Sequence, residues 1–159
     1  MIGDASWLVA ILSRWLHLSF ACLLVGGTFF MGFLVREGAT EGDTPATGSI
    51  YLKARRGLKM VVHSSVLFLL LTGTYNAMLN WAAYRRNIPL THALFGTHLL
   101  FALVVFAILM VTFARKQPRP TERKWLKIAA LLLFLTVLMA SSLKYAREHP
   151  KAQMIESRP

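Results

Sequence analysis

The sequence contains little that could carry out chemistry without a cofactor. Cys22 is the single cysteine in 159 residues, so no disulfide can form within the chain. The seven acidic residues all lie outside the long apolar runs or at their edges. This distribution argues against a carboxylate proton relay or a cation-coupled transporter, because both normally need a carboxylate inside the membrane. No HExxH, GxSxG or phosphate-binding glycine loop is present, so the sequence indicates no catalytic residues.

Long apolar runs dominate the sequence instead. Hydrophobic residues make up 55% of the chain, and a membrane-spanning helix needs about 20 mostly apolar residues. Backbone polar groups in lipid must be hydrogen-bonded internally, which favours helices. The sequence therefore predicts an all-α fold, an integral membrane four-helix bundle that forms one domain over residues 1–159. The four predicted spans cover about residues 6–35, 57–81, 90–114 and 125–145.

The connections between the spans are expected to be short. A polar tail is predicted over residues 146–159. The longest connection covers residues 36–56, where four residues are interpreted as helix breakers: Gly38, Gly42, Pro45 and Gly48.

Most of the positive charge lies between the apolar runs. The net charge is +11, and this placement fits topology signals and anionic lipid headgroups. No nucleic-acid-binding motif is present, so the predicted partner is the lipid bilayer and not nucleic acid. The connections after the first and third spans, with their flanks, carry eleven basic residues, and the opposite side carries seven. This excess predicts that both termini lie on the non-cytoplasmic side.

Three histidines, His17, His63 and His98, lie well inside the predicted spans, where ionisable side chains are costly and often functional, while His92 lies at the outer end of the third span. With about 1.5 Å of rise per residue, His17 and His98 lie roughly 16 Å and 12 Å from the outer ends of their spans. Two such level imidazoles can supply both axial ligands of a haem b held in a slot between helices. His63 lies roughly 9 Å from the inner end of its span. Small residues that could open the slot are Ser13, Ala21, Gly26, Gly27, Gly96 and Ala102.

Basic residues precede two of these histidines. Arg14 lies three residues before His17, and Lys59 lies four residues before His63, so each pair shares a helix face. Both cations lie on the interface side of the histidine, where haem propionates would point, and Arg14 is the predicted propionate partner. Snorkelling of the basic side chains to the headgroups explains each pair equally well.

The inner half of the bundle offers a second candidate site. Met31 is close in depth to His63 and could join it as a ligand of a second haem. Alternatively, His63 could bind copper(I) together with Met31 or Met110, because soft thioether ligands select this ion. Methionine in an apolar span more commonly serves packing alone.

Three stretches of the sequence give a family resemblance. The run WLHLSFACLLVGGTFF from Trp15 to Phe30 resembles the first helix of small bacterial membrane proteins in the copper-resistance D and HemJ-like group. RRGLKMVVHSSVLFLLLTGTY looks like their second helix, and GTHLLFALVVF is similar to their third. The resemblance implies a four- or five-helix protein of the bacterial inner membrane, with His17 at a metal centre. HemJ-like members are haem b proteins tied to protoporphyrinogen oxidation, and copper-resistance D members are linked to copper handling. The third span departs from the HemJ-like pattern, because it carries His98 and no lysine.

The leading hypothesis is therefore a small b-type membrane cytochrome with one or two haem b groups and His17 and His98 as axial ligands. It would act as an electron-transfer component or an oxidoreductase, between a quinol or a redox protein and an acceptor. Bis-histidine ligation leaves no open iron position, which favours electron transfer over oxygen chemistry. Two alternatives are a copper-handling membrane protein and a cofactor-free accessory subunit of a larger respiratory or photosynthetic complex. Assembly as a homo-oligomer or within a larger complex is compatible with each hypothesis.

Overall fold

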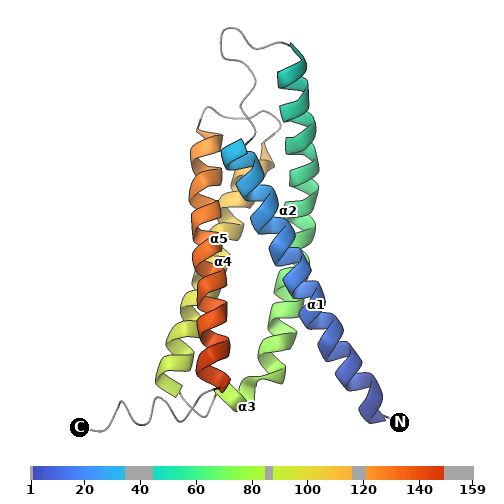
Figure 1. Ribbon diagram of the computed structural model, residues 1–159, viewed down its shortest axis with the longest axis vertical. Coiled ribbons are helices and arrows are strands. Elements are labelled where there is room, and N and C mark those ends of the chain that lie inside the picture. The colour runs from blue at the N-terminus through green and yellow to red at the C-terminus, as the bar shows by residue number, and fades with distance from the viewer. Residues whose placement is uncertain (1, 35–44, 85–87, 116–120, 149–159) are drawn as a thin grey trace, which may run out of the picture.

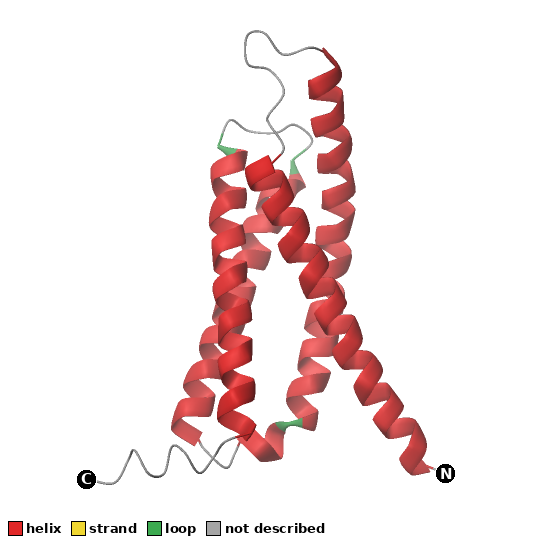
Figure 2. Cartoon of the chain, viewed as in Figure 1, coloured by secondary structure: helices red, strands yellow, loops and turns green. Residues whose placement is uncertain are grey.

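The computed structural model describes residues 2–34, 45–84, 88–115 and 121–148. Every regular element within these ranges is helical (Figures 1 and 2). The predicted all-α fold is therefore confirmed for the described part of the chain. In chain order the elements are α1 (Ile2–Phe29), the π-helical turn η1 (Phe30–Leu34), α2 (Pro45–Leu79), α3 (Trp81–Tyr84), α4 (Ile88–Ala114) and α5 (Glu122–Glu148).

Four of these helices are long and apolar enough to cross a membrane. Many large apolar side chains lie on the outside of the bundle, among them Trp15 with 72% of its surface exposed and Leu18 with 66%. Such a surface suits helices that face lipid chains. The prediction of four helices long and apolar enough to span a membrane is thus confirmed. The spans are Ser6–Leu34, Ile50–Leu79, His92–Ala114 and Glu122–Tyr145.

The second helix begins earlier than the sequence suggested. It starts at Pro45, whereas the prediction placed residues 36–56 in a connection. Proline is favoured at the first helical position, because its missing N–H would have no intrahelical partner there. Pro45 therefore starts the helix instead of breaking it, Gly48 lies within the first turns, and Arg55 becomes a helical residue.

The remaining boundaries differ by a few residues. The fourth spanning helix, α5, begins at Glu122 rather than at residue 125 and continues to Glu148, through the start of the predicted tail. The short α3 lies in the predicted connection between the second and third spans. Gly38 and Gly42 lie outside the described residues, as do residues 149–159.

Buried side chains form one stripe along each spanning helix. On α2 and α5 they recur mainly at alternating intervals of four and three residues, a spacing that keeps one face turned toward neighbouring helices. The half-buried His17 follows the buried Ser13 by four residues, and the half-buried His98 precedes the buried Val105 by seven residues. Both histidines therefore lie on the inward faces of their helices. The stripe of α2 is Tyr51, Arg55, Leu58, Val62, Ser65, Leu69 and Thr72, and that of α5 is Glu122, Leu126, Ala129, Leu133, Thr136 and Leu143.

The spanning helices pack as two pairs. α1 lies against α2 and α4 lies against α5, while α5 also contacts α1 (Figure 1). In the first pair, the ring of Phe20 stacks on that of Phe68 with 4.5 Å between centroids. α1 begins and α5 ends at the end of the bundle where α3 lies, called here the α3 end. The first residues of α5 lie at the opposite end, called the Glu122 end.

The π-helical turn after α1 packs tightly on α5. A Cβ atom on Gly32 would lie 3.3 Å from the backbone nitrogen of Lys127, so only glycine allows this approach without a shift. Arg123 donates from Nε to the carbonyl of Gly32 at 3.1 Å and from Nη2 to the carbonyl of Phe33 at 3.4 Å. Carbonyl groups at a helix end lack intrahelical partners, and Arg123 satisfies two of them.

Replacing Gly32 with alanine is expected to lower the free energy of unfolding by about 1–3 kcal/mol, because the added methyl group meets backbone atoms that cannot rotate away. Gly26→Ala is the matched control, since a Cβ there meets no atom within 4 Å. This control should leave stability unchanged or raise it by up to about 1 kcal/mol. Unfolding in mixed micelles, followed by circular dichroism, compares the two. Equal stability of both variants would contradict the tight contact at Gly32.

Candidate functional site

The imidazole of His17 is held by α2. Its Nδ1 lies 2.9 Å from the hydroxyl oxygen of Thr72. The neighbouring Gly73 makes room for the ring, because a Cβ at this position would lie 3.2 Å from Cε1 of His17. One helical turn away, the hydroxyl of Ser13 donates to the carbonyl of Thr72 at 3.5 Å. Two turns of α1 and one of α2 thus fix the orientation of the ring.

The partners of Thr72 determine which nitrogen of His17 carries the proton. The Thr72 hydroxyl has a single proton, and it donates this proton to the carbonyl of Phe68 at 2.6 Å. Toward His17 the hydroxyl can therefore only accept, so Nδ1 of the imidazole carries the N–H. In the neutral ring this leaves Nε2 unprotonated, with a lone pair available for a metal or a donor.

His98 is held in the same way by α5. Its Nδ1 lies 3.1 Å from the main-chain carbonyl oxygen of Thr136, which can only accept, so Nδ1 again carries the proton. The hydroxyl of Thr136 donates to the carbonyl of Leu132 at 2.7 Å. Within the described part of the chain, Nε2 of His98 forms no hydrogen bond, and neither does Nε2 of His17. Both rings therefore present a free Nε2.

The two imidazoles lie near each other in the bundle. Each is partly buried, and the rings are close enough to interact electrostatically. They come from different helix pairs, His17 from the α1–α2 pair and His98 from the α4–α5 pair. Each lies in the half of its apolar span nearer the α3 end. The arrangement thus brings two imidazoles, each with an unprotonated Nε2, into one region of the bundle from different helix pairs.

The other residues predicted around this site have different surroundings. Arg14 is exposed, one turn closer to the α3 end than His17. Ser13 and Gly27, expected to open a slot, face α2: Ser13 bonds to it, and a Cβ on Gly27 would lie 2.7 Å from the Leu58 side chain. These two positions therefore serve the contact between α1 and α2. A groove of about 680 Å³ does lie between the same two helices, on the side of Gly26 and Phe30, and neither histidine lines it.

The residues of the second candidate site differ in how deeply their side chains are buried. Met31 is 2% exposed and packs in the core. His63 is exposed, and its Nδ1 donates to the carbonyl of Lys59 in its own helix at 2.7 Å. Met110 is 38% exposed on α4. No group of three or more His, Cys, Asp or Glu side chains suited to a metal occurs in residues 2–34, 45–84, 88–115 and 121–148. The geometry therefore favours the His17–His98 pair over a site at His63.

A buried ionic cluster at the Glu122 end was not recognised in the sequence. Arg55 donates from Nε to Oε1 of Glu122 at 2.7 Å and from Nη2 to Oε2 at 3.0 Å, and the Tyr51 hydroxyl donates to Oε1 at 2.9 Å. Arg55 also donates to the carbonyls of Thr112 and Arg115 at the end of α4. Arg55 and Glu122 are 6% and 3% exposed. The cluster ties α2, α4 and α5 together, with each charge at the helix end that favours it.

Comparisons of the whole chain with known protein families, with characterised proteins and with solved structures give no significant match.

Proposed function

We propose that the protein is a small b-type membrane cytochrome that transfers electrons and binds haem b between α1 and α4. His17 and His98 would be its axial ligands. The observation that carries this proposal is the matched state of the two imidazoles: each donates its Nδ1–H to an oxygen of the neighbouring helix and keeps Nε2 free. Metal-ligating histidines characteristically donate the other ring N–H in this way, which fixes the ring orientation and raises its basicity.

The free-energy cost of polar atoms without hydrogen-bond partners supports the same proposal. A polar nitrogen without a partner is unfavourable in the low-dielectric surroundings of a membrane, and two such nitrogens occur near each other here. Coordination to one iron would satisfy both atoms together. The threonine partners and Gly73 would hold the rings in place, and the exposed Arg14 would neutralise a propionate on the side of the α3 end. A bound haem b supplies one-electron transfer.

Two imidazole ligands also limit the chemistry. With both axial positions filled by protein nitrogen, no position remains for oxygen or a substrate, which favours transfer to and from a quinol or a redox protein. Copper bound by His63 and Met31 is less well supported, because one side chain is exposed and the other lies in the core.

The proposal includes an orientation in the bacterial inner membrane. The Glu122 end would face the cytoplasm, because the basic residues that flank the first and third connections are more numerous. The α3 end would then face the outside, with His17 and His98 in the outer half of the membrane.

Difference spectra test this proposal directly. Membranes that contain the protein should show the Soret and α bands of a b-type haem in a reduced-minus-oxidised spectrum. Copper in the purified protein without these bands would favour copper handling instead. A colourless, metal-free protein that co-purifies with other subunits would favour the accessory-subunit alternative.

Replacing Thr72 with valine is expected to weaken haem binding about 10–100-fold, because loss of the hydroxyl that holds Nδ1 leaves the ligand ring unoriented. Thr72→Ser is the matched control, since it keeps the hydroxyl. Titration of the apoprotein with haem gives both binding constants, and circular dichroism verifies the helical fold. Equal affinities of the two variants would show that the Thr72 hydroxyl does not orient a ligand.

A further inference from the structure

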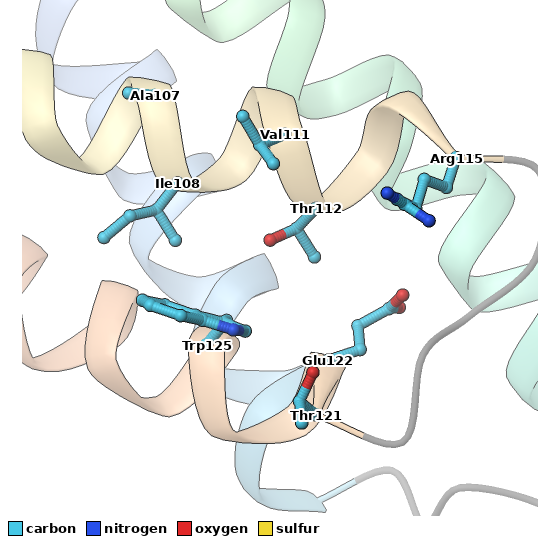
Figure 3. Close-up of a pocket in the computed structure, with 8 residues that line it drawn as sticks. All are labelled: Ala107, Ile108, Val111, Thr112, Arg115, Thr121, Glu122 and Trp125. Carbon is cyan, nitrogen blue, oxygen red and sulfur yellow. The ribbon is translucent and has the colours of Figure 1, made fainter.

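A pocket of about 320 Å³ lies between α4 and α5 at the Glu122 end, far from the histidine pair (Figure 3). One part of its wall is apolar, and includes Ile108, Val111 and the indole ring of Trp125. The other part is polar and lies where α4 ends and α5 begins, with the side chains of Thr112, Arg115 and Thr121. The pocket thus has an apolar half toward the membrane interior and a polar half at the surface.

The charge that this pocket offers to a ligand is positive. Glu122 also lines it, but its two oxygens already accept bonds from Arg55 and Tyr51, and Arg55 balances its charge. The main-chain carbonyl of Arg115 is held by Arg55, while its guanidinium group is exposed. Among the residues that the structure describes, this guanidinium has no ion pair. A ligand that supplies negative charge would therefore be favoured.

We infer that this pocket binds an anionic phospholipid, with its phosphodiester headgroup at Arg115 and an acyl chain along Val111 and Trp125. The spans of α4 and α5 end at Ala114 and Glu122, so the polar half lies at headgroup depth. Arginine binds phosphate through several parallel N–H bonds. The hydroxyls of Thr112 and Thr121 can add further donors.

The apolar half distinguishes a lipid from a soluble phosphate. Val111 is 64% exposed and Trp125 is 46% exposed, so the wall opens sideways to the bilayer rather than into a closed cavity. A free phosphate ion would use only the polar half. Tryptophan is also enriched at this depth because its ring is amphipathic. A lipid uses both halves of the pocket at once.

Quenching of Trp125 fluorescence by brominated lipid tests the inference. The full chain with Trp7, Trp15 and Trp81 replaced by phenylalanine keeps Trp125 as the single tryptophan. This protein is placed in phosphatidylcholine nanodiscs that contain brominated phosphatidylglycerol or, separately, brominated phosphatidylcholine. We expect about fivefold tighter association of phosphatidylglycerol, the effect of one basic residue near a membrane surface.

Variants distinguish lipid binding in the pocket from attraction by the general positive charge of the surface. Arg115→Gln should abolish the preference for phosphatidylglycerol, and Arg115→Lys should retain part of it. Lys124→Gln is the matched control, because Lys124 is an exposed cation at the same end that does not line the pocket. Ala107→Phe fills the apolar wall from an exposed position and should also remove the preference, which keeps the inference testable if Arg115→Gln does not fold.

Three results would overturn the inference. They are equal quenching by both lipids, equal losses from Arg115→Gln and Lys124→Gln, and displacement of the brominated lipid by soluble glycerophosphoglycerol, which would mark a site for a free phosphodiester. The haem proposal is independent of each, since it depends on the opposite half of the bundle.

Discussion

His17→Ala should abolish the Soret and α bands of the reduced-minus-oxidised spectrum. The substitution removes one of the two proposed axial ligands of the haem. The same loss is expected for His98→Ala, because each histidine would supply one of two ligands. Difference spectra of membranes with equal amounts of each variant, normalised by immunoblot, make the measurement.

His63→Ala is the matched control for both substitutions. It removes a histidine from the same bilayer, but from an exposed position where the ring bonds only to its own helix. The bands should therefore remain at full intensity. Bands that persist in His17→Ala and disappear in His63→Ala would contradict the assignment and favour the site at His63 and Met31.

Glu122→Gln should lower the free energy of unfolding by about 3–5 kcal/mol, because it removes the carboxylate that balances the buried charge of Arg55. Few single substitutions cost this much. Arg55 is 6% exposed and bonds both oxygens of Glu122, so solvent screens the pair little. Lys124→Gln, in the same turn of α5 but exposed, should change stability by less than about 0.5 kcal/mol.

A double variant separates the interaction energy of Arg55 and Glu122 from the cost of losing either side chain alone. Arg55→Met combined with Glu122→Met removes both charges, so no unpaired charge is left, and its cost should be well below the sum of the two single substitutions. Unfolding in mixed micelles gives all three free energies. Additive costs would mean that the buried pair contributes nothing beyond the two residues separately.

Hydropathy was enough to predict the helices, since each span is a continuous apolar run. Hydropathy is less informative about where each helix begins and ends. Pro45 and Gly48 were interpreted as breakers, although the stripe of buried residues on α2 already runs through Tyr51 and Arg55, outside the predicted span. The same spacing of four and three residues extends the helix N-terminal of residue 57, at least to Tyr51.

The candidate site could be located by depth but not by contacts. The positions of His17 and His98 along their helices follow from residue counting, so their similar depth was predictable. The partners of the two rings, Thr72 and Thr136, depend on how each helix is rotated in the bundle, which an apolar sequence encodes weakly. The pairing of Arg55 with Glu122 is unpredictable for a related reason, because Arg55 lies in the predicted connection over residues 36–56, where a basic residue indicates topology.

Electron paramagnetic resonance of the purified, oxidised protein tests the central claim most directly. Ferric haem held by two imidazoles is low-spin, so we expect a single low-spin signal that disappears in the double variant His17→Ala, His98→Ala. A high-spin signal in the unaltered protein, a low-spin signal that survives the double substitution, or no haem iron at all would contradict ligation between α1 and α4.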